Sequence, residues 1–157
     1  MRDFNVHPSL LEMEITETAL MQDPLHAIKT VRRLCDMGII ISIDDFGTGY
    51  SSMSYLKRLP ISDIKVDQSF IRNLLNDKDS FSIVKAIISL SKNLGFSVTA
   101  EGIETLGQAQ VLKYFDCDTL QGYYFSKPIA MKEIFSLADK HWTIQAINPN
   151  GIDYENC

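Results

Sequence analysis

The chain has 157 residues, of which 45% are hydrophobic, and it carries a formal net charge of −5 at pH 7. This length and apolar content predict one packed domain rather than two. Because the charge balance is acidic, no broad basic surface is expected, which argues against duplex DNA or RNA as a partner.

Short apolar runs alternate along the chain with longer segments of helical periodicity. The predicted strands, in chain order, are Leu10–Ile15, Ile39–Asp44, Asp63–Val66, Phe96–Ala100 and a short one around Thr119–Gln121. The predicted helices are Pro24–Met37, Ser51–Arg58, Ser80–Leu94, Thr105–Phe115 and Met131–His141. This alternation is typical of βα units with a parallel sheet, so we predict an α/β fold that is either part of a barrel or an open doubly wound sheet.

Local signals mark the ends of several predicted helices. Gly38 and Gly95 follow two of the periodic segments, where a helix C-terminus favours a residue with positive φ. Thr105 followed by Gln108 fits a capping box. These signals place the helix boundaries more firmly than periodicity alone.

The chain is predicted to divide into one domain and a short tail. Periodicity is lost after Trp142, so we predict a domain over residues 1–142 and a tail or linker over 143–157. The cysteines have no metal-site spacing and are predicted to be free thiols: Cys35, Cys117 and Cys157. Without a signal peptide or an apolar run of membrane-spanning length, the expected location is cytoplasmic, and any membrane attachment of a longer parent protein would lie upstream.

Polar residues gather where the predicted strands end. Glu14 and Glu17 close the first strand, Asp44 and Asp45 close the second, Lys65 lies in the third, Glu101 follows the fourth, and Gln121 follows the fifth. In parallel α/β folds the C-terminal edge of the sheet binds ligands, so these side chains are expected to lie close together. The oxygen donors suit Mg²⁺ or Mn²⁺. A fixed ammonium among carboxylates points to a phosphate ester, hydrolysed by a metal-activated water.

Each of these residues also has an ordinary structural explanation. Asp44 and Asp45 could be turn or capping residues, and Glu14 could be a solvated charge at a strand end. Lys65 is harder to explain, because a central parallel strand is normally apolar on both faces. Their shared position at one edge favours a functional site.

Two rival chemistries find little support. No catalytic triad is apparent, because the histidines are isolated along the chain: His7, His26 and His141. Gly47-Thr48-Gly49 has neither the Walker nor the dinucleotide-binding spacing. Gly47 and Gly49 are instead expected to let a loop fold tightly beside the site.

The motifs at these positions resemble the EAL-domain family of bacterial cyclic-di-GMP phosphodiesterases. They are LEMEITE (11–17), DDFGTGYSS (44–52), LKRLP (56–60) with IKVD (64–67), AEGIET (100–105) and QGYYFSKP (121–128). The resemblance implies a TIM-like (β/α) barrel, here incomplete with about five of the C-terminal βα units. It also implies metal-dependent hydrolysis of cyclic-di-GMP to linear pGpG in second-messenger signalling, with two Mg²⁺ or Mn²⁺ ions.

The resemblance assigns a role to each matching residue. Glu14 and Asp44 look like metal ligands, and Asp45 looks like a ligand of the second metal. Lys65 looks like the ammonium near the water and phosphate, and Glu101 looks like the general base. Gln121 looks like a positioning amide, and Glu104 looks like a supporting carboxylate. Glu17 looks like the anchor of the loop that contains Gly47 and Gly49, a loop that couples the site to dimerisation in the family.

The chain departs from the family pattern at its start. The Glu-Ala-Leu motif and a metal-binding Asn lie upstream of LEMEITE in the family and have no counterpart here, so about three strands and two metal ligands are expected to be missing. We therefore expect a second copy or an upstream segment to complete the barrel, a sensory or GGDEF-type domain in the parent protein, and low activity for this chain alone. Two alternatives stay open: a non-catalytic module that binds cyclic-di-GMP or a protein partner, and a truncated product that does not fold stably.

Overall fold

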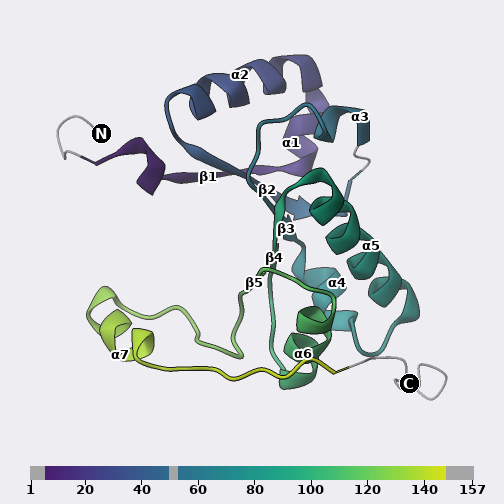
Figure 1. Ribbon diagram of the computed structural model, residues 1–157, viewed down its shortest axis with the longest axis vertical. Helices are drawn as coiled ribbons and strands as arrows, with labels where there is room; N and C mark the ends of the chain where they lie inside the picture. Colours follow the sequence, from purple (N-terminus) through teal and green to yellow (C-terminus); the bar gives the residue numbers. More distant parts are fainter. Residues whose placement is uncertain (1–5, 50–52, 148–157) are drawn as a thin grey trace.

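A single parallel sheet organises the computed structural model, which describes residues 6–49 and 53–147. Its strands are β1 (Glu12–Thr16), β2 (Ile40–Phe46), β3 (Asp63–Val66), β4 (Ser97–Ala100) and β5 (Thr119–Leu120). Each strand pairs in parallel with the next one along the chain, so the spatial order is β1-β2-β3-β4-β5 (Figure 1). Parallel βα units in chain order form part of a TIM-like barrel, which confirms the predicted fold class.

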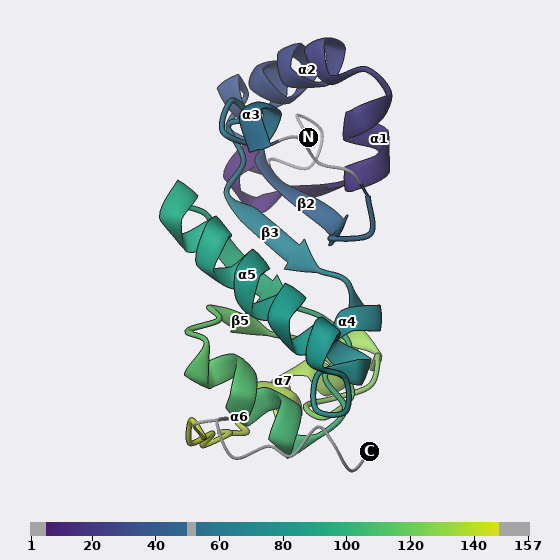
Figure 2. The same cartoon turned by 90° about the vertical axis from the view of Figure 1, so that its right-hand side faces the viewer.

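Helices connect the strands and cover one face of the sheet. They are η2 (Pro8–Leu10), α1 (Glu17–Gln22), α2 (Pro24–Asp36), α3 (Met53–Leu56), α4 (Gln68–Asn73), α5 (Lys78–Leu94), α6 (Leu106–Tyr114), η3 (Met131–Glu133) and α7 (Ile134–Ala138). The long helix α5 packs on β3 and β4, and α2 packs on β2 (Figure 2). Within the two described ranges, no helix is long and apolar enough to cross a membrane.

The two faces of the sheet differ in polarity. On the helix-covered face, the side chains of Ile41, Ile43 and Ile64 are buried in the hydrophobic core. The opposite face is largely polar and includes Asp63 and Lys65, which line a cavity of about 340 Å³ with other residues of the sheet. Because side chains alternate between the faces of a strand, the core residues of β3 fix Lys65 on the polar face.

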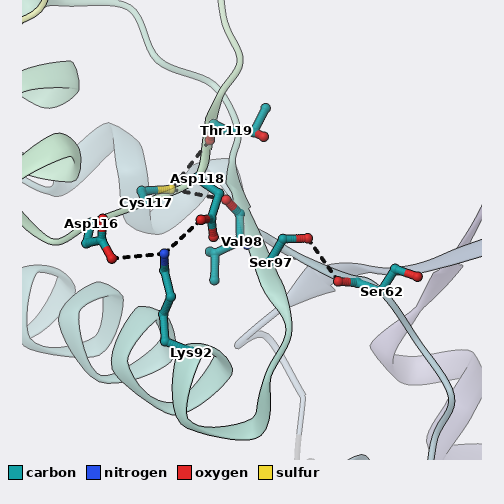
Figure 3. A network of polar contacts seen from close by, with 8 residues as sticks. All are labelled: Ser62, Lys92, Ser97, Val98, Asp116, Cys117, Asp118 and Thr119. Carbon is teal, nitrogen blue, oxygen red and sulfur yellow. Dashed lines mark hydrogen bonds and ion pairs between the residues drawn. The ribbon is translucent and has the colours of Figure 1, made fainter.

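A polar network holds the beginnings of β4 and β5 together (Figure 3). Lys92 Nζ on α5 lies 3.0 Å from Asp116 Oδ2 and 2.7 Å from Asp118 Oδ1. Asp118 Oδ2 also accepts a hydrogen bond from the backbone N–H of Val98 at 2.9 Å. Burial raises the pKa of the neighbouring Cys117 thiol to about 12, so this cysteine is protonated at neutral pH.

The strand predictions are confirmed, with shifts of one or two residues at most ends. The prediction Asp63–Val66 matches β3. The first strand begins at Glu12 rather than Leu10, because Leu10 belongs to the 3-10 turn that Pro8 begins.

The predicted helix ends are confirmed where local signals supported them. Gly38 and Gly95 have φ values of 87° and 84°, as expected after a helix C-terminus. Thr105 Oγ1 accepts from the N–H of Gln108 at 3.3 Å, and Gln108 Oε1 accepts from the N–H of Thr105 at 3.0 Å, which completes the capping box. Helix α5 begins two residues earlier than predicted, because Asp77 caps it.

Other helix predictions are wrong or incomplete. The helix predicted over Met131–His141 is instead the short turn η3 followed by α7, which ends at Ala138. Helices α1 and α4 were not predicted, since six residues are too few to display a periodicity. Glu17 consequently begins α1 and does not close β1. The first two residues of the predicted helix Ser51–Arg58 lie outside the described residues, as does the part of the predicted tail after residue 147.

Candidate active site

An ion-pair cluster lies at the C-terminal edge of the sheet. Lys65 Nζ on β3 donates a short hydrogen bond to Glu14 Oε1 on β1 and lies 2.6 Å from Glu101 Oε1, just after β4. The side chains of Lys65, Glu101 and Glu14 are 10%, 23% and 48% exposed. The structure thus brings together three residues that the sequence placed on different strands.

The cluster fixes the charge of its lysine. Burial by itself lowers the pKa of Lys65, but the hydrogen bonds to Glu101 and Glu14 outweigh burial and raise the pKa above its ordinary value. Lys65 is therefore a permanent ammonium at physiological pH. It can stabilise negative charge on a ligand, and it cannot serve as a proton acceptor.

Aspartates form a second group beside the cluster. Asp44 Oδ1 accepts from the N–H of Asp45 at 2.9 Å, and Asp45 has a φ of 53°, in the left-handed region. The carboxyl group of Asp45 lies close to that of Asp67. Burial and the neighbouring negative charges of Asp44 and Asp67 raise the pKa of Asp45.

Asp67 was not assigned a role from the sequence. It follows β3 and caps α4, accepting from the N–H of Ser69 at 2.9 Å. Burial raises its pKa, but the hydrogen bonds from Ser69 outweigh burial and lower it. The signal was present in the sequence, because Asp67 is a carboxylate directly after a strand, as Glu101 is.

Gln121 and Glu104 lie beside the cluster without joining its ion pairs. Gln121 follows β5, and its backbone N–H donates to the carbonyl of Ala100 at 2.9 Å. Its side chain lines the polar cavity together with Lys65. With Glu101 and Glu104, Gln121 also lines a neighbouring cavity of about 330 Å³.

Glu17 contacts the glycine loop that follows β2. Its side chain is 1% exposed, and Oε2 accepts from the N–H of Gly47 at 2.8 Å and of Gly49 at 3.2 Å. A Cβ atom on Gly49 would lie 3.0 Å from Glu17 Oε1, so a larger residue here would press on the Glu17 carboxylate. The end of the motif, residues 50–52, lies outside the described residues.

The donor types at this edge suit a hard divalent cation. Glu14, Asp44, Asp45 and Asp67 all offer carboxylate oxygens, the ligands that Mg²⁺ and Mn²⁺ prefer. Among residues 6–49 and 53–147, however, no three His, Cys, Asp or Glu side chains are arranged to hold a metal ion. Glu14 is paired with Lys65, so the predicted metal ligands stay a prediction.

Comparison with known proteins gives consistent matches. The EAL domain family profile matches residues 2–128. The bifunctional diguanylate cyclase/cyclic di-GMP phosphodiesterase MucR of Pseudomonas aeruginosa is 42% identical over 132 residues, which cover 84% of this chain and 19% of MucR. The chain thus spans about a fifth of that relative's length.

Solved structures agree with these sequence matches. A structure described as PaMucR phosphodiesterase in complex with c-di-GMP has a TM-score of 0.83 at 41% identity, over 85% of this chain and 54% of that one. A manganese and cyclic-di-GMP complex of Klebsiella pneumoniae BlrP1 has a TM-score of 0.74 at 32% identity, over 81% and 32% of the two chains.

Proposed function

The chain belongs to the EAL domain family, and from this premise we propose that it contributes one side of a cyclic-di-GMP phosphodiesterase site. The observation that carries the proposal is the cluster of Glu14, Lys65 and Glu101 at the C-terminal edge of parallel strands. In α/β folds this edge is where ligands bind. The names of its relatives support the substrate class.

The reaction would open one phosphodiester of the cyclic dinucleotide. Water adds to phosphorus, the bond from phosphorus to the 3′ oxygen breaks, and the freed 3′ oxygen takes up a proton, which gives linear pGpG. The proton acceptor must be a carboxylate, because Lys65 is permanently charged. We assign this role to Glu101, the more buried of the two carboxylates that contact Lys65.

The remaining predicted residues have supporting roles in this proposal. Lys65 stabilises the charge that develops on the phosphoryl oxygens, and Gln121 orients the water. Glu14, Asp44, Asp45 and Asp67 would hold Mg²⁺ or Mn²⁺ on the strength of their donor chemistry. Such an ion, when bound, supplies a Lewis acid and lowers the pKa of water.

Hydrolysis of cyclic-di-GMP in Mg²⁺ or Mn²⁺ tests the proposal. The chain alone is compared with the same chain extended upstream through the family's Glu-Ala-Leu motif, and we expect only the extended form to produce pGpG. In that form, Lys65→Met should lower kcat by roughly 10²- to 10³-fold. The matched control is Lys85→Met, at an exposed position of α5, which should leave kcat unchanged. If neither form produces pGpG, the proposal is wrong.

A non-catalytic binding module is the second candidate. It is favoured by the pairing of both cluster carboxylates with Lys65 and by the lack of a three-ligand group within the described ranges. Such a module would bind cyclic-di-GMP without turnover. Its affinity would be insensitive to Asp44→Asn, whereas turnover by an enzyme would be lost.

The partners of the site are also proposals. We propose that a second copy or an upstream segment completes the barrel, and that the parent protein carries a sensory or GGDEF-type domain. The small share of MucR that the chain covers supports a longer parent protein. Light scattering of the chain over a range of concentrations would reveal association of two copies.

A further inference from the structure

The outward face of α2 carries cations that the proposed function does not use. Two further cations come from the LKRLP motif, and together they form a basic surface of exposed residues: Lys29, Arg32, Arg33, Lys57 and Arg58. We propose that this basic surface docks on an anionic lipid membrane, with the side chains of Leu25 and Met37 entering the headgroup region. Docking of this kind would not depend on hydrolysis of cyclic-di-GMP.

Packing on the sheet fixes which side of α2 is exposed. Ile28 and Val31 are 6% and 1% exposed, and they belong to the hydrophobic core beneath α2. Leu25, Lys29 and Arg32 recur at intervals of four and three residues, so they lie along one exposed side of the helix. This side points away from the core, and a membrane bound there would leave the polar face of the sheet uncovered.

The LKRLP motif extends the same surface. Its two leucines are 2% and 5% exposed and anchor the segment in the core, whereas Lys57 and Arg58 between them are exposed. Cys35 Sγ on α2 donates a hydrogen bond to the carbonyl of Pro60 at 3.0 Å. The end of α2 therefore lies beside the motif, and both views place α3 next to α2 (Figures 1 and 2).

The cations of the basic surface are not neutralised by salt bridges among the described residues. Within residues 6–49 and 53–147, the ion pairs involve only Lys65 and Lys92. Asp36 is the only carboxylate in α2, so cations remain in excess there. The Debye length is about 8 Å at physiological ionic strength, and the local cations therefore outweigh the net charge of −5 near an anionic surface.

Exposed apolar side chains favour a membrane over an acidic polypeptide. Leu25 and Met37 are 59% and 54% exposed, and they lie on either side of the cations of α2 in the sequence. Helices that lie in a membrane interface combine such residues with Lys and Arg, because apolar groups enter the headgroup region while cations bind anionic lipids. An acidic polypeptide would require the cations but not the exposed apolar side chains.

Co-sedimentation of the full chain with lipid vesicles tests the basic surface. The chain should bind vesicles of phosphatidylcholine mixed with phosphatidylglycerol and not vesicles of phosphatidylcholine alone, and binding should weaken as the salt concentration rises. The triple variant Arg32→Gln/Arg33→Gln/Arg58→Gln should lower the affinity by roughly 100-fold, because each cation near an anionic surface contributes about fivefold.

The matched control removes the same charge elsewhere. Lys78→Gln/Lys85→Gln/Lys113→Gln changes exposed positions of α5 and α6, and this variant should retain binding. Met37→Ser should weaken binding without changing its salt dependence, which tests the apolar contact separately from charge. Circular dichroism establishes that each variant is folded.

Each outcome decides the proposal. Loss of affinity in the first triple variant alone supports the basic surface, whereas equal loss in both triple variants means that net charge governs binding and that the surface is wrong. If wild type binds polyglutamate but not the mixed vesicles, the partner is an acidic polypeptide and membrane docking is wrong. If wild type binds neither, docking is also wrong. No cyclic dinucleotide is used, so failure of docking leaves the proposed function standing, and failure of hydrolysis leaves docking standing.

Discussion

Replacing Asp118 with alanine should destabilise the fold at the start of β4. Asp118 Oδ2 is the acceptor, at 2.9 Å, for the backbone N–H of Val98, a residue with 0% exposure (Figure 3). Its Oδ1 also pairs with Lys92 Nζ at 2.7 Å. Asp118→Ala removes both the hydrogen bond to Val98 and the ion pair with Lys92. Their contributions to the free energy of unfolding should differ greatly.

The magnitude follows from the buried N–H. Leaving a buried backbone donor without an acceptor costs about 1–3 kcal/mol, so Asp118→Ala should lower the free energy of unfolding by that amount. The ion pair should add little, because Lys92 is partly exposed and keeps Asp116 at 3.0 Å.

Urea unfolding at 25 °C measures the effect, with two matched variants. Asp118→Asn keeps an oxygen that can accept from Val98, so it should retain most of the stability. Asp116→Asn removes an 89% exposed carboxylate at a position with φ of 63°, which asparagine tolerates, and should change the free energy of unfolding by less than about 0.5 kcal/mol. Equal destabilisation by Asp118→Ala and Asp118→Asn would refute the reasoning, since the ion pair would then be the larger contribution.

Three further predictions concern other contacts. Glu17→Ala should accelerate amide hydrogen exchange at Gly47, whose N–H loses its acceptor, while Glu17→Gln should keep most of the protection; equal exchange in the two variants would contradict this. Thr105→Ala should lower the free energy of unfolding by about 1 kcal/mol, because it removes a helix cap, and an unchanged urea midpoint would count against the cap. Hydrogen bonds from Ser80 lower the pKa of Asp77 in the folded state. The Asp77 charge therefore stabilises the folded state above the unfolded pKa of about 3.9, and this stabilisation is lost as the pH falls. Compared with Asp77→Asn, wild type should therefore lose more stability between about pH 5 and pH 3, and parallel pH profiles would argue against this linkage.

Strand periodicity predicted much of the site. The parallel order of the strands predicted that Lys65, Glu14 and Glu101 lie at the same edge, whereas the polar face that Lys65 occupies was not predicted, because a central parallel strand was expected to be apolar on both faces. The pairing of Lys65 with both carboxylates was not predictable, because side-chain partners depend on the spacing of neighbouring strands in three dimensions.

Short elements and long-range contacts account for what the sequence did not predict. Asp67 caps α4, a six-residue helix with no detectable period, and its contact with Asp45 joins the ends of two strands.

The order of strands in the sheet has a consequence for how the chain folds. Every strand pairs with the strand that precedes it in the sequence, so no pairing has to wait for a distant segment. Loop closure is less costly for such neighbours than for remote partners, and the sheet can grow one βα unit at a time as the chain leaves the ribosome. β1 and β5 are the edge strands of this sheet, so a further unit would add at one of them until the barrel closes.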